Sequence, residues 1–293
     1  MQASFAGMTS AGRRATSRRY QGMLGRIVGA ASRKGVSLLA RIAGKDRVVA
    51  TIRGINSGVR RLCASTHNLQ MFAEWNVAPP PEWFDHYVDQ FDAWHRTGNS
   101  LWVERGCFSL LAMRENARVL ELCCGDGFNA RHFYSLRAAN VIACDFDRSA
   151  IAHAKKRNSG PNIEFRVADI RDQMPEGTFE NIVWDAAIEH FTELEIDAIL
   201  KSIRSRLTPE GILSGYTLVE REDQVKHLVH HEYEFKSKDD LLRFFTPFFR
   251  NVRVFETVYP TRHNLYFWAS DSEIPFSERW GMQVVHSSGD EAR

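Results

Sequence analysis

The chain has 293 residues, of which 44% are hydrophobic and 11% aromatic, enough for one large folded domain with an extension. Its five cysteines form no C-x-x-C pair and are odd in number. This excludes a structural zinc site and a disulfide framework, and it favours free thiols in a reducing compartment. No apolar run approaches the ~18 residues of a membrane span, and none resembles a signal-peptide core, so we expect a cytoplasmic protein.

The formal net charge of +2 hides a strong asymmetry along the chain. The first 61 residues hold 13 lysines and arginines against one acid, Asp46, and the remainder holds 25 basic and 35 acidic residues. Residues 1–80 are therefore predicted to form a basic extension on an acidic globular part. An acidic globular part makes nucleic acid an unlikely substrate, because such a substrate is held through its phosphates.

Within the extension, residues 1–22 are rich in Arg, Ser, Gly and Ala, a composition typical of disorder. Over residues 23–43, apolar positions recur at helical spacing between basic side chains. This pattern predicts an amphipathic helix on an anionic membrane surface, and hence a peripheral location. A poorly ordered tail and a mitochondrial transit peptide fit the same composition, so all three interpretations stay open.

A proline triplet at residues 79–81 separates the extension from the rest of the chain. After it, apolar residues keep the i, i+3, i+4, i+7 spacing of an amphipathic helix, namely Phe84, Tyr87, Val88, Phe91 and Trp94. We predict a helical cap over residues 81–116.

From residue 117 onward, continuous apolar runs alternate with helical patterns. The runs are residues 117–123, 139–145, 162–169, 180–186 and 212–219, with helices over 148–157, 193–207 and 239–245. Such runs between helices indicate parallel strands covered on both faces. Residues 208–211 are predicted to form a turn. Two further strands, residues 252–258 and 264–270, are joined too closely for a parallel crossover and must be antiparallel.

The predicted fold is therefore α/β: a Rossmann-like, doubly wound seven-stranded sheet with an antiparallel last strand over residues 117–272. A C-terminal tail is expected over residues 273–293.

The stretch VLELCCGDGFNARHF, residues 119–133, carries the clearest site signal. Residues 125–130 match G-x-G-x-x-A, the dinucleotide fingerprint, and Asp145 lies 18 residues after Gly127. An NAD-dependent oxidoreductase is thus one interpretation. Three features disfavour it: Glu121 precedes the glycines, Cys123 occupies the first-turn position, and the sheet is expected to end in an antiparallel strand.

The same stretch resembles the first motif of the class I S-adenosylmethionine-dependent methyltransferase family, a strand ending in an acid followed by G-x-G-x-G. Cys123 replaces the first glycine. The resemblance covers residues 117–270, about half the chain, and several motifs occur in order. It implies S-adenosyl-L-methionine as the cofactor.

The resemblance also implies a role for each matching residue. Gly125 and Gly127, with Cys123, let backbone approach the methionine part, and Glu121 orders its amino-acid end. Asp145 accepts hydrogen bonds from both ribose hydroxyls, a bidentate contact. The adenine contacts fall to Phe146 on its face and to Asp169 and Ile170 at its edge.

In this family the loop after the fourth strand, here residues 184–191, faces the transferred methyl group. Methyl transfer mainly needs proximity and alignment, but a hydroxyl acceptor must also lose a proton, for which a histidine is suited. His190 is the candidate base. Alternatively, Glu189 and His190 cap the next helix and shape the pocket floor.

A second cluster, HHEYEF over residues 230–235, offers His231 with Glu232 or Glu234 to orient an acceptor hydroxyl. The alternative is a solvated loop. Metal-dependent RNA-tail methyltransferases of this fold carry E-x-x-E-H in the loop after the fourth strand. Ala186 stands where their first Glu would be, so we expect no metal.

The acceptor is less defined. No N-P-P-Y or D-P-P-Y tetrad occurs after the fourth strand, which disfavours amino methylation of bases. The closing pattern HHEYEF…RHNLYFWAS resembles bacterial methyltransferases that modify small molecules or glycans. We predict methyl transfer to an oxygen of a small molecule or saccharide. The alternatives are a non-enzymatic, membrane-associated protein that retains the cofactor fold, or the NAD-dependent oxidoreductase.

Overall fold

The computed structural model describes residues 32–75, 94, 98, 101–221, 223, 226–260 and 262–274. The chain divides into two compact units, Met1–Gln70 and Met71–Arg293. The disorder expected over residues 1–22, most of the helix expected from Phe84 to Trp94, and most of the C-terminal tail lie outside the described residues.

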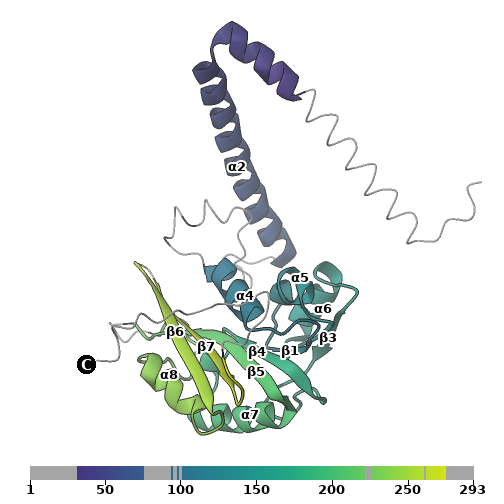
Figure 1. Ribbon diagram of the computed structural model, residues 1–293, viewed down its shortest axis with the longest axis vertical. Coiled ribbons are helices and arrows are strands. Elements are labelled where there is room, and N and C mark those ends of the chain that lie inside the picture. The colour runs from purple at the N-terminus through teal and green to yellow at the C-terminus, as the bar shows by residue number, and fades with distance from the viewer. Residues whose placement is uncertain are drawn as a thin grey trace, which may run out of the picture. The chain divides into compact units, whose positions relative to one another are not determined.

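The first unit is helical where it is described. A helix over residues 32–43 covers the described part of the predicted amphipathic segment, and Gly44, at φ 87°, separates it from α2 (Lys45–Trp75) (Figure 1). The sequence did not predict α2, which contains Gly54 and Gly58, residues of low helix propensity. No helix in the described part of the chain is both long and apolar enough to cross a bilayer.

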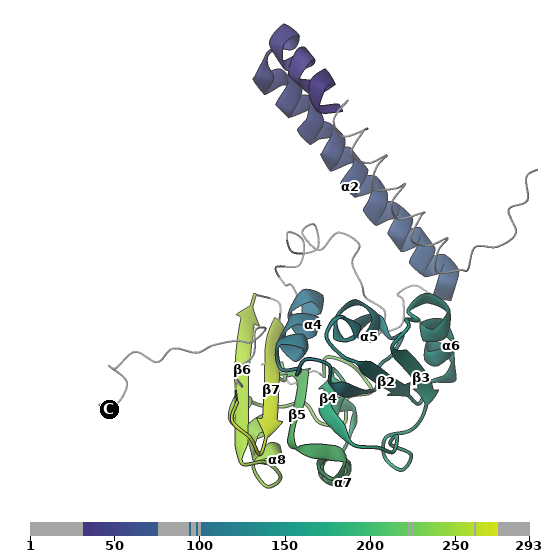
Figure 2. The same ribbon diagram turned by 45° about the vertical axis from the view of Figure 1, so that its right-hand side comes forward.

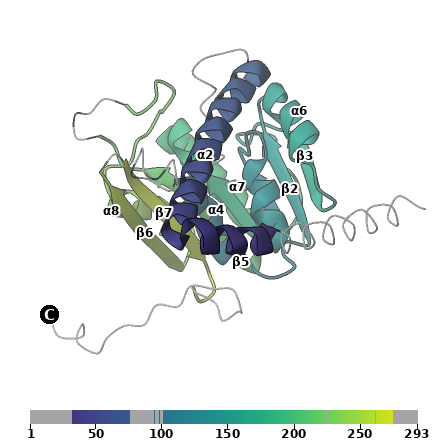
Figure 3. The same cartoon turned by 90° about the horizontal axis from the view of Figure 1, so that it is seen from above.

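The second unit is built on a seven-stranded sheet in the order β3-β2-β1-β4-β5-β7-β6 (Figures 1 and 2). The strands are β1 (Arg118–Leu122), β2 (Asn140–Asp145), β3 (Ile163–Val167), β4 (Phe179–Asp185), β5 (Leu207–Leu218), β6 (Asn251–Tyr259) and β7 (Arg262–Ser270). The neighbours among β1 to β5 pair in parallel, whereas β7 is antiparallel to both β5 and β6. Figure 3 shows β6 and β7 at one end of the sheet and β3 at the other. The predicted Rossmann-like sheet with an antiparallel last strand is confirmed.

Helices cover both faces of this sheet. They are α4 (Leu101–Leu111), α5 (Phe128–His132), α6 (Arg148–Arg157), α7 (Glu193–Arg206) and α8 (Lys238–Phe245), with short 3-10 turns η1 (Tyr134–Leu136) and η2 (Ile188–His190). Figure 2 shows α4, α5 and α6 on one face and α7 and α8 on the other. This arrangement explains why β1 and β4 read as continuous apolar runs rather than alternating ones.

One predicted element is wrong. The sequence predicted a turn over residues 208–211, but β5 already begins at Leu207. The pairing with β4 shifts register, because Phe179 pairs with Leu207 while Asn181 pairs with Ile212. The extra residues of β5 form an irregularity inside the strand, and such bulges are set by the partner strand rather than by local sequence.

The sheet sets the place of the site. Asp145 is the last residue of β2 and Asp185 the last residue of β4, and both strands flank β1. Parallel neighbouring strands end at one edge of the sheet, so these two acids and the loop after β1 share that edge. Open α/β sheets bind their ligands there.

Candidate cofactor and acceptor site

The loop after β1 is shaped by left-handed backbone. Cys123, Gly125 and Gly127 have φ values of 53°, 53° and 74°. Gly127 has a second constraint, because an added Cβ would lie 2.3 Å from the Phe165 ring. A larger residue would therefore push α5 away from the sheet. Cys123 bears a side chain in the same conformation, which costs roughly 1–2 kcal/mol.

The thiols in this loop are poor nucleophiles. Burial raises the pKa of Cys123 and of Cys124 well above the usual value, and the carboxyl groups nearby raise it further. Both side chains therefore stay protonated at neutral pH, and only a thiolate would attack an electrophile. A ligand bound at this loop would therefore meet thiols that do not react with it.

Asp145 ties the end of β2 to this loop. Its Oδ2 accepts a hydrogen bond from the backbone nitrogen of Gly125 at 2.9 Å, and its Oδ1 accepts one from that of Asp147 at 2.9 Å. Burial raises the pKa of Asp145, whereas these backbone donors lower it. Each carboxylate oxygen can accept more than one hydrogen bond, so both retain capacity for a bidentate ligand contact.

Glu121 is a buried carboxyl with an unsatisfied oxygen. Its side chain is 2% exposed, and its Oε2 has no hydrogen-bond partner among the described residues. Burial raises the pKa of Glu121 well above its usual range, and the nearby carboxyl groups of Asp185 and Asp126 raise it further. A buried acid with one unsatisfied oxygen, set among other acids and near the Arg105 guanidinium, can accept a hydrogen bond from a donating or positively charged ligand.

Asp185 ends β4 at the start of the loop over residues 184–191, and no role was predicted for it from the sequence. Its carboxylate accepts hydrogen bonds from Tyr134 Oη at 2.8 Å, Asn129 Nδ2 at 3.3 Å and Ser109 Oγ at 3.4 Å. Burial raises the pKa of Asp185, and the nearby guanidinium of Arg105 lowers it. The end of β4 is thereby fixed to α4, α5 and η1. The feature of the sequence that could have identified Asp185 is its position as an acid at the end of a buried strand.

The expected adenine residues lie in different environments. Phe146 is 70% exposed and Ile170 is buried. The carboxylate of Asp169 is held by the Arg171 guanidinium, with Nη2 2.6 Å from Oδ2, and this contact lowers the pKa of Asp169. Asp169 therefore has a partner within the chain that competes with an adenine amino group.

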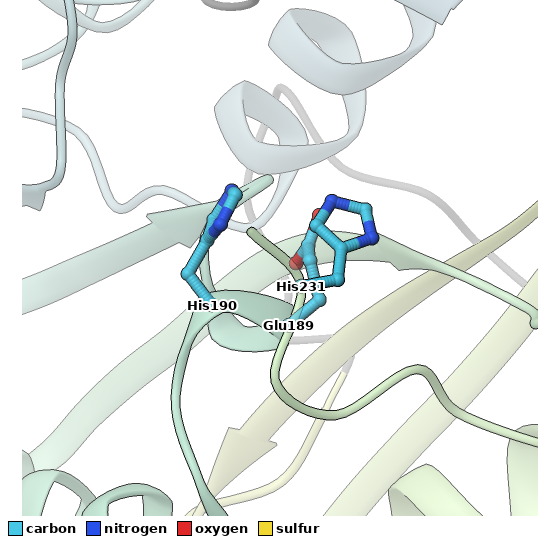
Figure 4. Close-up of side chains that lie close together, drawn as sticks. All are labelled: Glu189, His190 and His231. Atoms are coloured by element: carbon cyan, nitrogen blue, oxygen red, sulfur yellow. The ribbon is translucent and has the colours of Figure 1, made fainter. Parts of the chain in front are cut away.

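The structure brings Glu189, His190 and His231 together (Figure 4). One potential ligand atom from each lies within 4.8 Å of the other two. Glu189 and His190 belong to η2, and the Glu189 carbonyl accepts hydrogen bonds from the backbone nitrogens of Glu232 and Tyr233. These bonds anchor the segment that carries His231 against η2.

Each of these side chains has a defined neighbour. His231, only 1% exposed, has its Nδ1 2.5 Å from Glu234 Oε1. His190 Nδ1 lies 3.3 Å from the His230 carbonyl, and Thr217 Oγ1 donates to Glu189 Oε2 at 3.0 Å. Of the two expected partners of His231, the contact is with Glu234. The burial of His231 also contradicts the solvated-loop alternative at that residue.

The other histidines of this segment are placed apart from the cluster. His230 is exposed. His227 Nε2 lies 3.0 Å from the Val219 carbonyl, and burial lowers the pKa of His227. Neither belongs to the group formed by Glu189, His190 and His231.

Comparisons with known proteins agree with this geometry. Residues 119–211 match a family model described as a methyltransferase domain. The malonyl-(acyl-carrier protein) O-methyltransferase of Bacillus anthracis is 31% identical over 111 residues, 38% of this chain and 40% of that protein. Its Bacillus cereus counterpart is 27% identical over 157 residues, 48% of this chain and 58% of that protein. The chain thus spans about half the length of the curated relatives it matches.

A solved structure described as a DhpI–SAH complex is 20% identical, covering 73% of this chain and 95% of that one with a TM-score of 0.48. The sheet order, the loop after β1 and the family match define this part of the chain as a class I S-adenosylmethionine-dependent methyltransferase domain. The dinucleotide interpretation of residues 125–130 is thereby set aside.

S-adenosylmethionine is the cofactor of this class, and the chain's residues fit it. Its amino-acid end carries an ammonium group and its sulfur a positive charge, and the loop after β1 is lined by acids. The unsatisfied Glu121 Oε2 matches a cationic or donating group, and Asp145 retains acceptor capacity on both oxygens. Such a ligand carries no phosphate, in contrast to a dinucleotide, whose pyrophosphate would be repelled by these acids.

Proposed function

We propose that this chain transfers the methyl group of S-adenosylmethionine to an oxygen atom of a small molecule or saccharide. The observation that carries the proposal is the cluster of Glu189, His190 and His231, in which Glu189 and His231 are buried and His190 is half-buried. It lies beyond Asp185, the acid that ends β4 at the cofactor edge of the sheet. The names of the relatives, which are O-methyltransferases, support oxygen as the accepting atom.

The bound cofactor supplies a methyl group on a sulfonium, which is already a good leaving group. The chain itself must align the acceptor oxygen with the bond between the methyl group and the sulfur, and accept the proton that the acceptor hydroxyl loses. Glu121 and Asp145 are assigned to the cofactor. The cluster after β4 is assigned to the acceptor.

The hydrogen bonds of the histidines support this assignment. Glu234 and the His230 carbonyl are acceptors, so each neutral imidazole donates its Nδ1–H to them and carries its lone pair on Nε2. His190 and His231 thus each present a basic or ligating nitrogen. Glu234 also stabilises positive charge on His231, as a carboxylate does behind a general base.

Arginines near the cluster favour an acceptor with an anionic or strongly polar group. The Arg105 guanidinium lies 5.3 Å from the centre of the Tyr216 ring, and Arg262 Nε donates to Tyr216 Oη at 3.0 Å. Burial and the Glu189 carboxylate raise the pKa of Tyr216 and the guanidiniums of Arg262 and Arg105 lower it, so both arginines and Glu189 act on the same phenol group.

The test uses S-adenosylmethionine with a deuterated methyl group and a panel of hydroxy acids, carboxylic acids and sugars. S-adenosylhomocysteine release and a labelled O-methyl product are expected from the wild type and not from Asp145→Ala. Alkaline hydrolysis then separates methyl esters from methyl ethers. Label found only on nitrogen or carbon would contradict oxygen as the acceptor.

A further inference from the structure

We propose that Glu189, His190 and His231 bind a divalent first-row transition-metal ion, whose purpose, though not its binding, rests on the proposed methyl transfer. The three donors form a set of two imidazoles and one carboxylate, which is a common ligand set for such ions. Figure 4 shows the side chains side by side, two from η2 and one from the segment after β5.

The spacing suits a small cation. One ligand atom from each residue lies within 4.8 Å of the others. Metal–ligand bonds of about 2.0–2.2 Å place the donors of a tetrahedral site roughly 3.3–3.6 Å apart. Side-chain rotation over about 1 Å therefore closes the site, and η2 and its backbone contacts need not move.

The surroundings of each donor are those of a metal ligand. A metal-bound histidine donates its other ring nitrogen to a carboxylate or carbonyl, which fixes the tautomer and raises its basicity. His231 has Glu234 at 2.5 Å and His190 has the His230 carbonyl at 3.3 Å, both on Nδ1. Glu189 is oriented in turn by the Thr217 hydroxyl at 3.0 Å.

The charge of the buried Glu189 carboxylate also favours a bound metal ion. Glu189 is 2% exposed, and among the described residues no lysine or arginine forms an ion pair with it. Its side-chain hydrogen bond comes from a neutral hydroxyl. A buried carboxylate is costly unless it is paired or coordinates a metal. A divalent cation between Glu189 and the two imidazoles removes this cost.

From the sequence no metal is expected, because Ala186 stands where the E-x-x-E-H pattern carries its first acid. The missing ligand has a different consequence in the structure. Catalytic metal sites keep three protein ligands and leave a position open for water or substrate. With Ala186 there, the open position is available to the acceptor oxygen. A metal-bound hydroxyl loses its proton to water more readily than a free one.

The experiment uses the full chain, stripped with a chelator and titrated with Co²⁺, whose visible absorption reports coordination. Metal content of the untreated protein is measured in parallel. We expect about one ion per chain and a rise in melting temperature on binding. The visible absorption of the bound Co²⁺ should be that of an ion coordinated by imidazole nitrogens. Glu189→Gln, which keeps the side-chain shape, abolishes binding. Glu234→Gln weakens it about 10–100-fold, as for other residues that orient a ligating histidine.

His132→Asn is the matched control, because His132 is an exposed histidine on α5. It keeps full Co²⁺ binding. S-adenosylhomocysteine affinity checks that each variant is folded. Absence of stoichiometric Co²⁺ binding to the wild type, or unchanged binding in Glu189→Gln, overturns the metal site. Methyl transfer that continues in the stripped protein overturns the metal's role in the reaction, while leaving metal binding and the proposed function intact. Metal binding without methyl transfer to any acceptor overturns the proposed function alone.

Discussion

The Asp145 carboxylate accepts a hydrogen bond from the Gly125 backbone nitrogen at 2.9 Å, so the acid that ends β2 holds the loop after β1. Asp145→Ala removes this contact together with the expected ribose contacts. We expect S-adenosylhomocysteine binding to weaken by about 1.5–3 kcal/mol, the range for hydrogen bonds to a charged group. Isothermal titration calorimetry measures the change. An unchanged affinity contradicts the assignment of Asp145 to the cofactor.

Glu121→Gln is expected to raise the stability of the ligand-free protein and to weaken its binding of S-adenosylhomocysteine. Folding raises the pKa of the Glu121 carboxyl above its value in the unfolded chain, about 4.3. The protonated carboxyl therefore adds to the stability of the folded state at low pH, and this contribution is lost as the pH rises through the pKa in the folded state. The amide of glutamine does not ionise, so the variant avoids the free-energy cost of a charged group at this buried position. In the absence of ligand, the variant should therefore be more stable than wild type at neutral pH by about 1–3 kcal/mol.

The measurement is denaturant unfolding of both proteins between pH 4 and 8. The stability difference should shrink toward acid, and S-adenosylhomocysteine affinity should fall in the variant. A variant that is less stable than wild type at neutral pH would show that the Glu121 carboxylate has a stabilising partner.

Ligand choice provides a direct check on the cofactor. S-adenosylhomocysteine at 100 times its dissociation constant should stabilise the protein by about 2.7 kcal/mol. NAD should produce no shift, because the buried acids Glu121, Asp126 and Asp145 around the loop after β1 repel the negative charge of a pyrophosphate. Differential scanning fluorimetry with the two ligands distinguishes these outcomes, and stabilisation by NAD alone would contradict the cofactor.

His190→Ala tests the acceptor side. We expect turnover to fall by about 10²–10⁴-fold, whether the imidazole receives a proton or holds a metal. Cofactor affinity should barely change, because the cofactor contacts are assigned to Glu121 in β1 and Asp145 at the end of β2. The wild-type rate should rise with pH through the range in which imidazoles titrate, about 6.5, and the variant should lose this dependence. A variant that keeps the wild-type pH profile would assign His190 to pocket shape.

We propose that the basic extension contacts anionic membrane. Exposed apolar side chains accompany its basic residues, among them Leu38, Leu39, Ile42, Ile52 and Ile55. Deletion of residues 1–61 should leave the melting temperature of the methyltransferase domain nearly unchanged and abolish binding to anionic liposomes. Each basic residue near such a surface contributes about 1 kcal/mol. Neutral liposomes are the control, and a truncated protein that fails to fold would make the segment structural.

The sequence predicted much of the sheet because β1, β2 and β4 are continuous apolar runs and helical patterns separate several of the strands. The antiparallel direction of β7 was inferred from the short connection to β6 alone. The start of β5 could not be predicted, since it depends on how Phe179 and Asn181 pair across to it.

The candidate site, like the sheet, could be predicted from the sequence only in part. Glu121 and Asp145 could be located because they lie at strand ends in chain order. The partners of Asp185 come from α4, α5 and η1, which only tertiary packing brings together. The Glu234 contact of His231 had a local signal, since the two are three residues apart, but the burial of His231 depends on contacts with η2.

Two residues with side chains, Cys123 after β1 and Ala186 after β4, adopt left-handed backbone at φ 53° and 50°. Glycine at either position releases roughly 1–2 kcal/mol of strain, partly offset by about 0.5–1 kcal/mol of added chain entropy in the unfolded state. Both turns border the ligand edge of the sheet. They are therefore natural compensating positions in directed evolution: a change that widens acceptor range but weakens the fold can be rescued by Cys123→Gly or Ala186→Gly.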